Sequence, residues 1–120
     1  MRRRVVLHRR DLPSDVERRL FTIVDAVAEV FNVPTGLVLG LRRDHAIAQA
    51  RHVAMYIARD QVSVPLVDLA AFFGRHYSAL IHATKNVENW REYDRAFQSS
   101  FEAAVRRVGT GLHVGAGYKR

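Results

Sequence analysis

Cysteine is missing from this 120-residue sequence, and its absence excludes several kinds of chemistry. The chain can form no disulfide, no thiolate metal site and no cysteine nucleophile. Its six histidines form no pair spaced as i and i+4 and belong to no carboxylate–histidine motif, so we expect no metal site. No serine sits in a nucleophile elbow either. We therefore expect neither an enzyme nor a bound cofactor.

Long apolar runs are also missing. Charged or polar residues interrupt every apolar run well before the ~18 residues that a membrane-crossing helix needs. No apolar segment follows the arginine-rich start, as it would in a signal peptide. We expect a cytoplasmic protein that does not associate with membranes.

Positive charge is plentiful by contrast. Lysine and arginine outnumber aspartate and glutamate by 19 to 12, which gives a formal net charge of +7. Such a surface favours a polyanionic partner or an acidic protein surface, and charge alone does not choose between them. Five arginines fall in residues 1–13, which we interpret as a flexible basic arm. The arm is either a solvated tail or a segment that contacts DNA.

The length allows one modest core and therefore one domain, which we expect over residues 14–108. Residues 109–120 form a glycine-rich segment. A nucleotide-binding fingerprint would need a third glycine at the correct spacing, a preceding strand and a following helix, and the segment has none of these. We interpret this segment as a disordered tail. No strand-like alternation appears, so the fold class is all-α, a compact bundle of five to six helices.

The first long helix is predicted from Ser14 to about Asn32. Ser14 and Glu17 have the spacing of a capping box. Its buried stripe is expected at Leu20, Val24, Val27, Ala28 and Phe31. Pro34 follows, and residues 35–39 are too few for more than a turn or two of helix.

Two further helices are predicted, one in the middle of the chain and one near its end. One is expected to begin near Ile47, and the segment LRRDHA before it predicts a loop that carries two arginines. Its inward positions are Ala50, Val53, Ala54 and Ile57. The last is an amphipathic helix over Arg91–Val108. Its core residues are expected to be Tyr93, Phe97, Phe101, Ala104 and Val108.

Residues 66–89 have the pattern of a helix-turn-helix. An apolar helical pattern over Leu66–Phe73, with Pro65 in its first turn, meets Gly74, and a second pattern runs from about His76 to Asn89. Glycine permits the backbone angles of a tight turn between helices. The second helix would then present Arg75, His76, Tyr77 and Ser78 on its first turn, where a recognition helix meets base edges.

A resemblance to a known family rests on three blocks in order. They are AVAE at 26–29, LRRDHAIAQARHVAMYIAR at 41–59 and FGRHYSALIHATKNV at 73–87. Together they resemble the C-terminal DNA-binding domain of the bacterial chromosomal replication initiator, DnaA, over about residues 20–90, and look closest to small standalone relatives of that domain. The phosphate loop of the initiator's ATPase module ends in Gly-Lys-Ser/Thr. No glycine here directly precedes a lysine, so nucleotide hydrolysis is not expected.

The resemblance also implies a set of DNA-binding residues. Arg43, with Arg42 beside it, falls on the loop arginine that enters the minor groove, and Arg51 falls on a DNA-contacting arginine of the helix that follows this loop. Arg75 matches the arginine that opens the recognition helix, and Lys85 a later basic residue. The complete set is Arg42, Arg43, Arg51, Arg75, His76, Tyr77, Ser78 and Lys85.

This sequence departs from the family at the reading positions. The initiator's turn has two glycines where only Gly74 stands here, and its Asp-His-Thr-Thr set appears as His76 to Ala79. An aspartate can accept a hydrogen bond from cytosine N4, whereas histidine binds differently. We therefore expect this chain to prefer a DNA sequence other than the box that the initiator itself binds.

Each of these residues also has a less specific interpretation. Arg42 and Arg43 could form a solvated loop, although DNA contact is favoured. Tyr77 could stack, contact a phosphate or pack on a neighbour. We expect His82, beyond the first turn, to pack or to bind the backbone rather than to touch a base.

The leading hypothesis is a monomeric, nucleoid-associated domain that binds double-stranded DNA sequence-specifically. By resemblance, it would bind a replication origin, regulate the initiation of replication, or control transcription from related sites. The alternative is an adaptor that contacts the replication initiator or the replication machinery as protein. A basic surface serves both functions.

Overall fold

The computed structural model describes residues 12–109, and within that range it contains helices and no strands. The helices are α1 (Ser14–Phe31), α2 (Thr35–Val38), α3 (His45–Gln61), α4 (Leu66–Phe72), α5 (Ser78–Tyr93) and α6 (Arg95–Val108). The all-α fold class is confirmed, with six helices in this part of the chain. The basic arm up to residue 11 and the glycine-rich segment from residue 110 lie outside the described residues.

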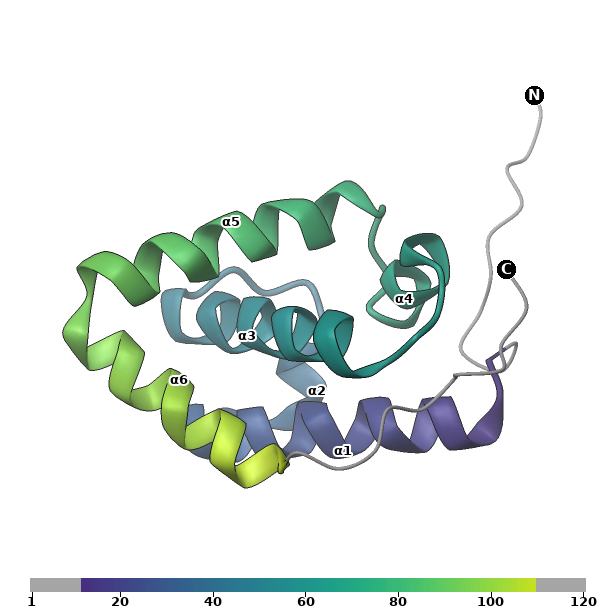
Figure 1. Ribbon diagram of the computed structural model, residues 1–120, viewed down its shortest axis with the longest axis horizontal. Coiled ribbons are helices and arrows are strands. Elements are labelled where there is room, and N and C mark those ends of the chain that lie inside the picture. Colours follow the sequence, from purple (N-terminus) through teal and green to yellow (C-terminus); the bar gives the residue numbers. More distant parts are fainter. Residues whose placement is uncertain (1–11, 110–120) are drawn as a thin grey trace.

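α3 lies at the centre of the bundle (Figure 1). It packs against α5 on one side and against α1 on the other, so α5 and α1 form opposite faces of the molecule. α6 contacts both α1 and α5, and α4 packs beside α3 and α5. The apolar faces of these helices form one core, in which Leu12 is also buried. None of the helices within residues 12–109 is long and apolar enough to cross a membrane.

α1 forms where the apolar stripe predicts it. Leu20, Val24, Val27 and Ala28 are buried, and the helix ends at Asn32, whose φ of 58° and ψ of 46° are left-handed. The predicted capping box is wrong. Ser14 already lies inside the helix and makes no capping hydrogen bond, because Pro13 takes the N-cap position and its carbonyl accepts from the Glu17 amide at 3.0 Å.

The chain bends between α5 and α6, and the predicted single helix from Arg91 to Val108 is therefore wrong. α5 continues to Tyr93, and Asp94 then adopts extended angles and caps α6, its Oδ1 accepting from the Phe97 amide at 3.0 Å. This break leaves Tyr93 79% exposed instead of buried. The later core positions, Phe97 and Phe101 among them, are buried as predicted.

α4 and α5 form the predicted helix-turn-helix. Gly74 has a φ of +67°, and its amide donates to the Ala71 carbonyl at 2.9 Å. The Arg75 amide donates to the Ala70 carbonyl at 3.0 Å, which completes a Schellman motif at the end of α4. The boundaries differ from the prediction: Pro65 precedes α4 as its N-cap, α4 ends at Phe72 instead of Phe73, and α5 runs from Ser78 to Tyr93 instead of from His76 to Asn89.

Candidate nucleic-acid interface

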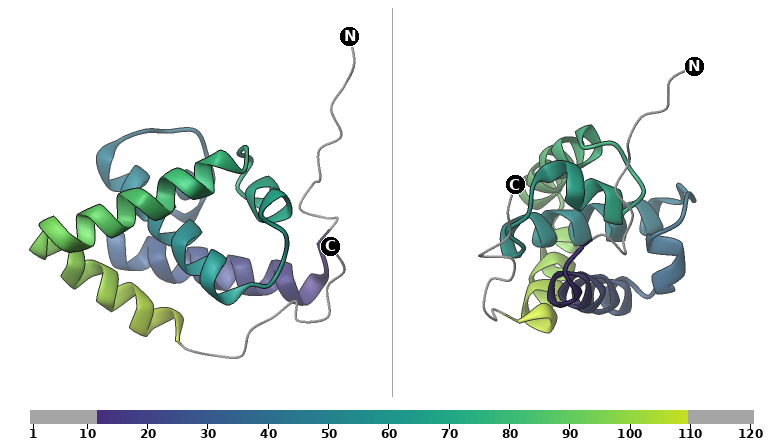
Figure 2. Two further views of the ribbon diagram at one scale, coloured as in Figure 1. Left: turned by 45° about the horizontal axis from the view of Figure 1, so that its top comes forward. Right: turned by 90° about the vertical axis from the view of Figure 1, so that its right-hand side faces the viewer.

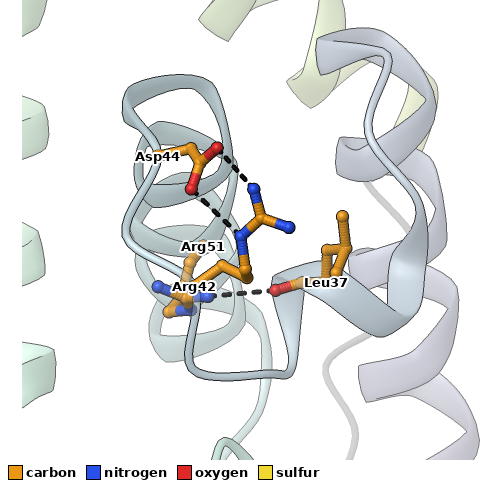
Figure 3. Close-up of polar contacts among 4 residues, drawn as sticks. All are labelled: Leu37, Arg42, Asp44 and Arg51. Carbon is orange, nitrogen blue, oxygen red and sulfur yellow. Dashed lines mark hydrogen bonds and ion pairs between the residues drawn. The ribbon is translucent and has the colours of Figure 1, made fainter.

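The loop between α2 and α3 carries Arg42 and Arg43, as the sequence predicted. It stands at the edge of the molecule in both views of Figure 2. Arg42 turns back on its own loop and donates to both carboxylate oxygens of Asp44, at 3.1 and 2.7 Å (Figure 3). This ion pair raises the pKa of Arg42 and lowers that of Asp44, chiefly through the hydrogen bonds. Arg43 is exposed and has no hydrogen bond or ion pair within residues 12–109.

Arg51 holds the start of this loop from inside the fold. The side chain comes from α3 and is only 5% exposed. Its Nε donates to the Val38 carbonyl at 2.7 Å. Its Nη2 donates to the Leu37 carbonyl at 3.0 Å, as Figure 3 shows. These carbonyls belong to α2, so Arg51 fixes α2 against α3. The guanidinium thereby positions the loop that follows α2.

Arg75 holds the same loop from the helix-turn-helix. Its Nη2 donates to the Gly40 carbonyl at 2.9 Å, and its Nη1 donates to the Phe73 carbonyl at 3.1 Å. The side chain is half-buried and joins the turn between α4 and α5 to the loop between α2 and α3. The structure therefore brings the predicted loop and the predicted recognition helix together as neighbouring parts of one surface.

A pocket of about 630 Å³ lies between the loop, α3 and the first turn of α5. Among the residues that the structure describes, its lining contains three guanidinium groups and no carboxylate. The lining residues are Leu41, Arg43, Ala48, Arg51, His52, Met55, Arg75 and Ala79.

The arginines around this pocket repel one another. Burial and the positive charges of Arg75 and Arg43 lower the pKa of Arg51. Burial and the charge of Arg43 lower the pKa of Arg75. Arginine keeps its proton at neutral pH all the same, so the pocket carries an unneutralised positive potential. A polyanion placed against it would relieve this repulsion.

The start of α5 presents two aromatic rings beside this pocket. His76 and Tyr77 are exposed and lie just before the helix instead of on its first turn, while Ser78 is the first helical residue. The His76 Nδ1 lies 3.2 Å from the Ser78 backbone nitrogen and 3.0 Å from the Ser78 Oγ. The His76 and Tyr77 rings pack together with centroids 4.3 Å apart.

The exposed face of α5 continues beyond this first turn. Lys85 is exposed on it. The expectation that His82 packs or binds the backbone is wrong, because Leu80 and Ala83 occupy the inward positions and leave His82 exposed. Ile81, which sequence reasoning missed, is 41% exposed on the same helix. Its spacing of three residues from Ser78 could have indicated this.

Sequence reasoning also missed two residues at the pocket. Leu41 is 81% exposed at the edge of the loop. His52 is half-buried and stacks on Trp90, with ring centroids 5.6 Å apart and planes 17° apart. Burial, followed by the charges of nearby Arg51 and other basic groups, lowers the pKa of His52. No helical pattern in the sequence could indicate this stacking, because it joins α3 to the far end of α5.

Five residues make up the basic surface: Arg42, Arg43, Arg51, Arg75 and Lys85. The first four surround the loop and the turn, and Lys85 extends the surface along α5. Among the described residues, no three histidine or acidic side chains come together as metal ligands would. The basic surface offers positive charge and hydrogen-bond donors.

Fold and site together define a helix-turn-helix domain with a basic loop beside its second helix, an arrangement that places a helix in the major groove of DNA. A family model described as the bacterial DnaA protein helix-turn-helix matches residues 21–87, more than half of the chain. The chain belongs to this family.

Relatives of the chain include several chromosomal replication initiators. DnaA 1 of Protochlamydia amoebophila is 41% identical over 86 residues, which are 72% of this chain and 19% of that protein. DnaA of Aquifex aeolicus is 33% identical over 67% of this chain and 20% of its own length. DnaA of Deinococcus deserti is 28% identical over 80% of this chain and 21% of its own length. The chain thus spans about a fifth of the length of the curated relatives it matches.

Proposed function

We propose that residues 14–108 form a domain that binds double-stranded DNA sequence-specifically, and that it acts at a replication origin or in regulating the initiation of replication. The observation that carries the proposal is the pocket between the loop and α5, which is lined by three arginines and, within residues 12–109, by no carboxylate. The family, and relatives that are chromosomal replication initiators, support the biological setting.

The geometry suggests how the duplex would lie. The major groove, about 12 Å wide, admits an α-helix, and the start of α5 is the exposed end of the second helix of the motif. Arg75 ties the α2–α3 loop to that start. With α5 in the major groove, the loop meets the neighbouring minor groove, where a free guanidinium is attracted to the negative potential.

The five basic residues would then have different roles in DNA binding. Arg43 is exposed and unpaired within the described residues, so it is the arginine that can enter the minor groove. Arg51 and Arg75 donate their hydrogen bonds to backbone carbonyls, so they chiefly position the loop and add positive charge. Lys85 reaches a phosphate farther along α5. Arg42 can add a phosphate contact only by leaving Asp44.

Selection from random oligonucleotides tests this function, followed by fluorescence anisotropy on the enriched duplex and on a scrambled one. The expected result is one enriched sequence that binds about a thousandfold or more tighter than the scrambled duplex. A preference for a sequence other than the initiator's box follows from the residues at the start of α5. Enrichment of no sequence, together with direct binding to a replication initiator, would contradict this function and favour the adaptor.

A further inference from the structure

The imidazole of His76 is held in one tautomer by the start of α5. The backbone nitrogen of Ser78 lies 3.2 Å from the His76 Nδ1, and a backbone N–H can only donate. Nδ1 must therefore be the acceptor and carries no proton. The Ser78 hydroxyl, 3.0 Å from the same nitrogen, can also donate to it. In the neutral ring the proton then sits on Nε2.

This contact gives the imidazole a structural reason to stay in place. The first amides of a helix lack partners inside the helix, and His76 supplies one for the Ser78 amide, as a capping side chain does. The ring of Tyr77 packs against the imidazole at 4.3 Å between centroids. Within residues 12–109, Nε2 has no hydrogen-bond partner, and the side chain is exposed. One N–H donor is thus left free at the exposed end of the second helix of the motif.

We propose that His76 is a specificity-determining residue whose Nε2–H donates to N7 of a guanine in the major groove. The inference rests on the proposed function and goes beyond it by naming the base. A carboxylate at the same position could only accept, and would select the N4 amino group of cytosine. His76 requires an acceptor on the base instead, because the one acceptor nitrogen of its imidazole is already occupied by the Ser78 amide.

The choice of guanine follows from what each base presents in the major groove. Guanine offers two neighbouring acceptors, N7 and O6, and no donor. Adenine sets its N6 amino donor beside N7, and thymine sets a methyl group beside O4. Cytosine offers a donor, which an N–H cannot pair with. A fixed imidazole donor is therefore matched best by guanine and worst by cytosine.

The tautomer is testable in the free protein by ¹⁵N NMR of the histidine side chains. For the neutral form of the His76 ring, long-range ¹H–¹⁵N correlations should show a protonated Nε2 and an unprotonated Nδ1. The His76→Asp variant is the matched control for the DNA-binding experiments. Its carboxylate can also accept from the Ser78 amide, so α5 stays capped. Finding the proton on Nδ1 would overturn the inference irrespective of any DNA.

The base contact is tested by replacing each guanine of the selected duplex in turn with 7-deazaguanine, which lacks the N7 acceptor and keeps O6. At one guanine, the change should weaken binding of the unmodified protein by about fivefold to tenfold and leave the affinity of His76→Asp unchanged. His76→Asp should in turn prefer the duplex in which cytosine replaces that guanine. Duplex binding with no such coupled position would overturn the inference and leave the proposed function standing. Failure to bind any duplex would overturn both.

Discussion

At the level of single residues, the arginines of the basic surface differ in what their guanidinium groups bind. Arg51 and Arg75 donate to backbone carbonyls, and Arg42 donates to Asp44. Only Arg43 is left without a partner among the described residues. An exposed arginine with no protein contact adds little to stability, so its value lies in what it can bind outside the protein.

Replacement of Arg43 therefore separates DNA binding from folding. Arg43→Ala should weaken duplex binding by about 1–3 kcal/mol and leave the thermal midpoint nearly unchanged. Arg18→Ala is the charge-matched control, because Arg18 is exposed on α1, on the opposite side of α3 from α5. Anisotropy titrations should show a loss for Arg43→Ala well beyond that for Arg18→Ala. Equal losses would mean that net charge alone drives binding.

His52 offers a second test at this scale, through the single tryptophan that it stacks on. Burial and nearby positive charges lower the pKa of His52 below its ordinary value of 6.5. The unfolded chain therefore binds this proton more readily, and stability should decline as the pH falls from about 6.5 toward the lower pKa of the folded state.

Trp90 fluorescence should report this titration with a midpoint below 6.5. His52→Gln should remove the transition. His45→Gln should keep it, although His45 also contacts Trp90 edge-on at 6.3 Å between centroids. A transition that survives His52→Gln would assign the signal to another group.

At the scale of elements, the helix-turn-helix depends on the backbone of Gly74. Its φ of +67° is left-handed, where a side chain costs roughly 1–2 kcal/mol, although a Cβ there would meet no atom within 4 Å. Gly74→Ala should lower the thermal midpoint by about 4–8 °C per kcal/mol lost. Gly36→Ala is the control, since Gly36 lies in α2 with equally open surroundings and no positive φ. Equal midpoints for the two variants would contradict the assigned strain.

The sequence could predict these elements because their signals are local. Helical spacing of apolar residues indicated α1, α3 and α6 as core helices, and Gly74 next to the end of an apolar pattern indicated the turn. The boundaries were less accurate where two local signals competed. Ser14 lost the N-cap position to Pro13, and Asp94 interrupted a continuous amphipathic pattern by capping α6.

The candidate site was only partly predictable, because its connections cross between distant elements. The loop arginines and the start of α5 came from the resemblance. The contacts of Arg51 with α2 and of Arg75 with Gly40 depend on how the helices pack, which no sequence pattern records. The tautomer of His76 depends on a helix start two residues later than predicted.

At the scale of the whole molecule, the basic surface faces one side of the bundle. α5 and the α2–α3 loop carry it, and α1 forms the opposite face (Figure 1). If about 4–6 phosphates are neutralised, the logarithm of the binding constant should fall with the logarithm of the salt concentration with a slope of about −4 to −5. Affinities measured at several salt concentrations check this, and a flat dependence would argue for the adaptor.

The most direct test of DNA binding by the loop and α5 is a map of backbone amide shifts, measured by ¹H–¹⁵N NMR on the full chain as the selected duplex is added. The shifts are expected to change over residues 41–45 and 75–85, whereas the exposed positions of α1 should keep theirs. Changes centred on α1 and α6, or none at saturating duplex, would contradict a DNA interface formed by the loop and α5.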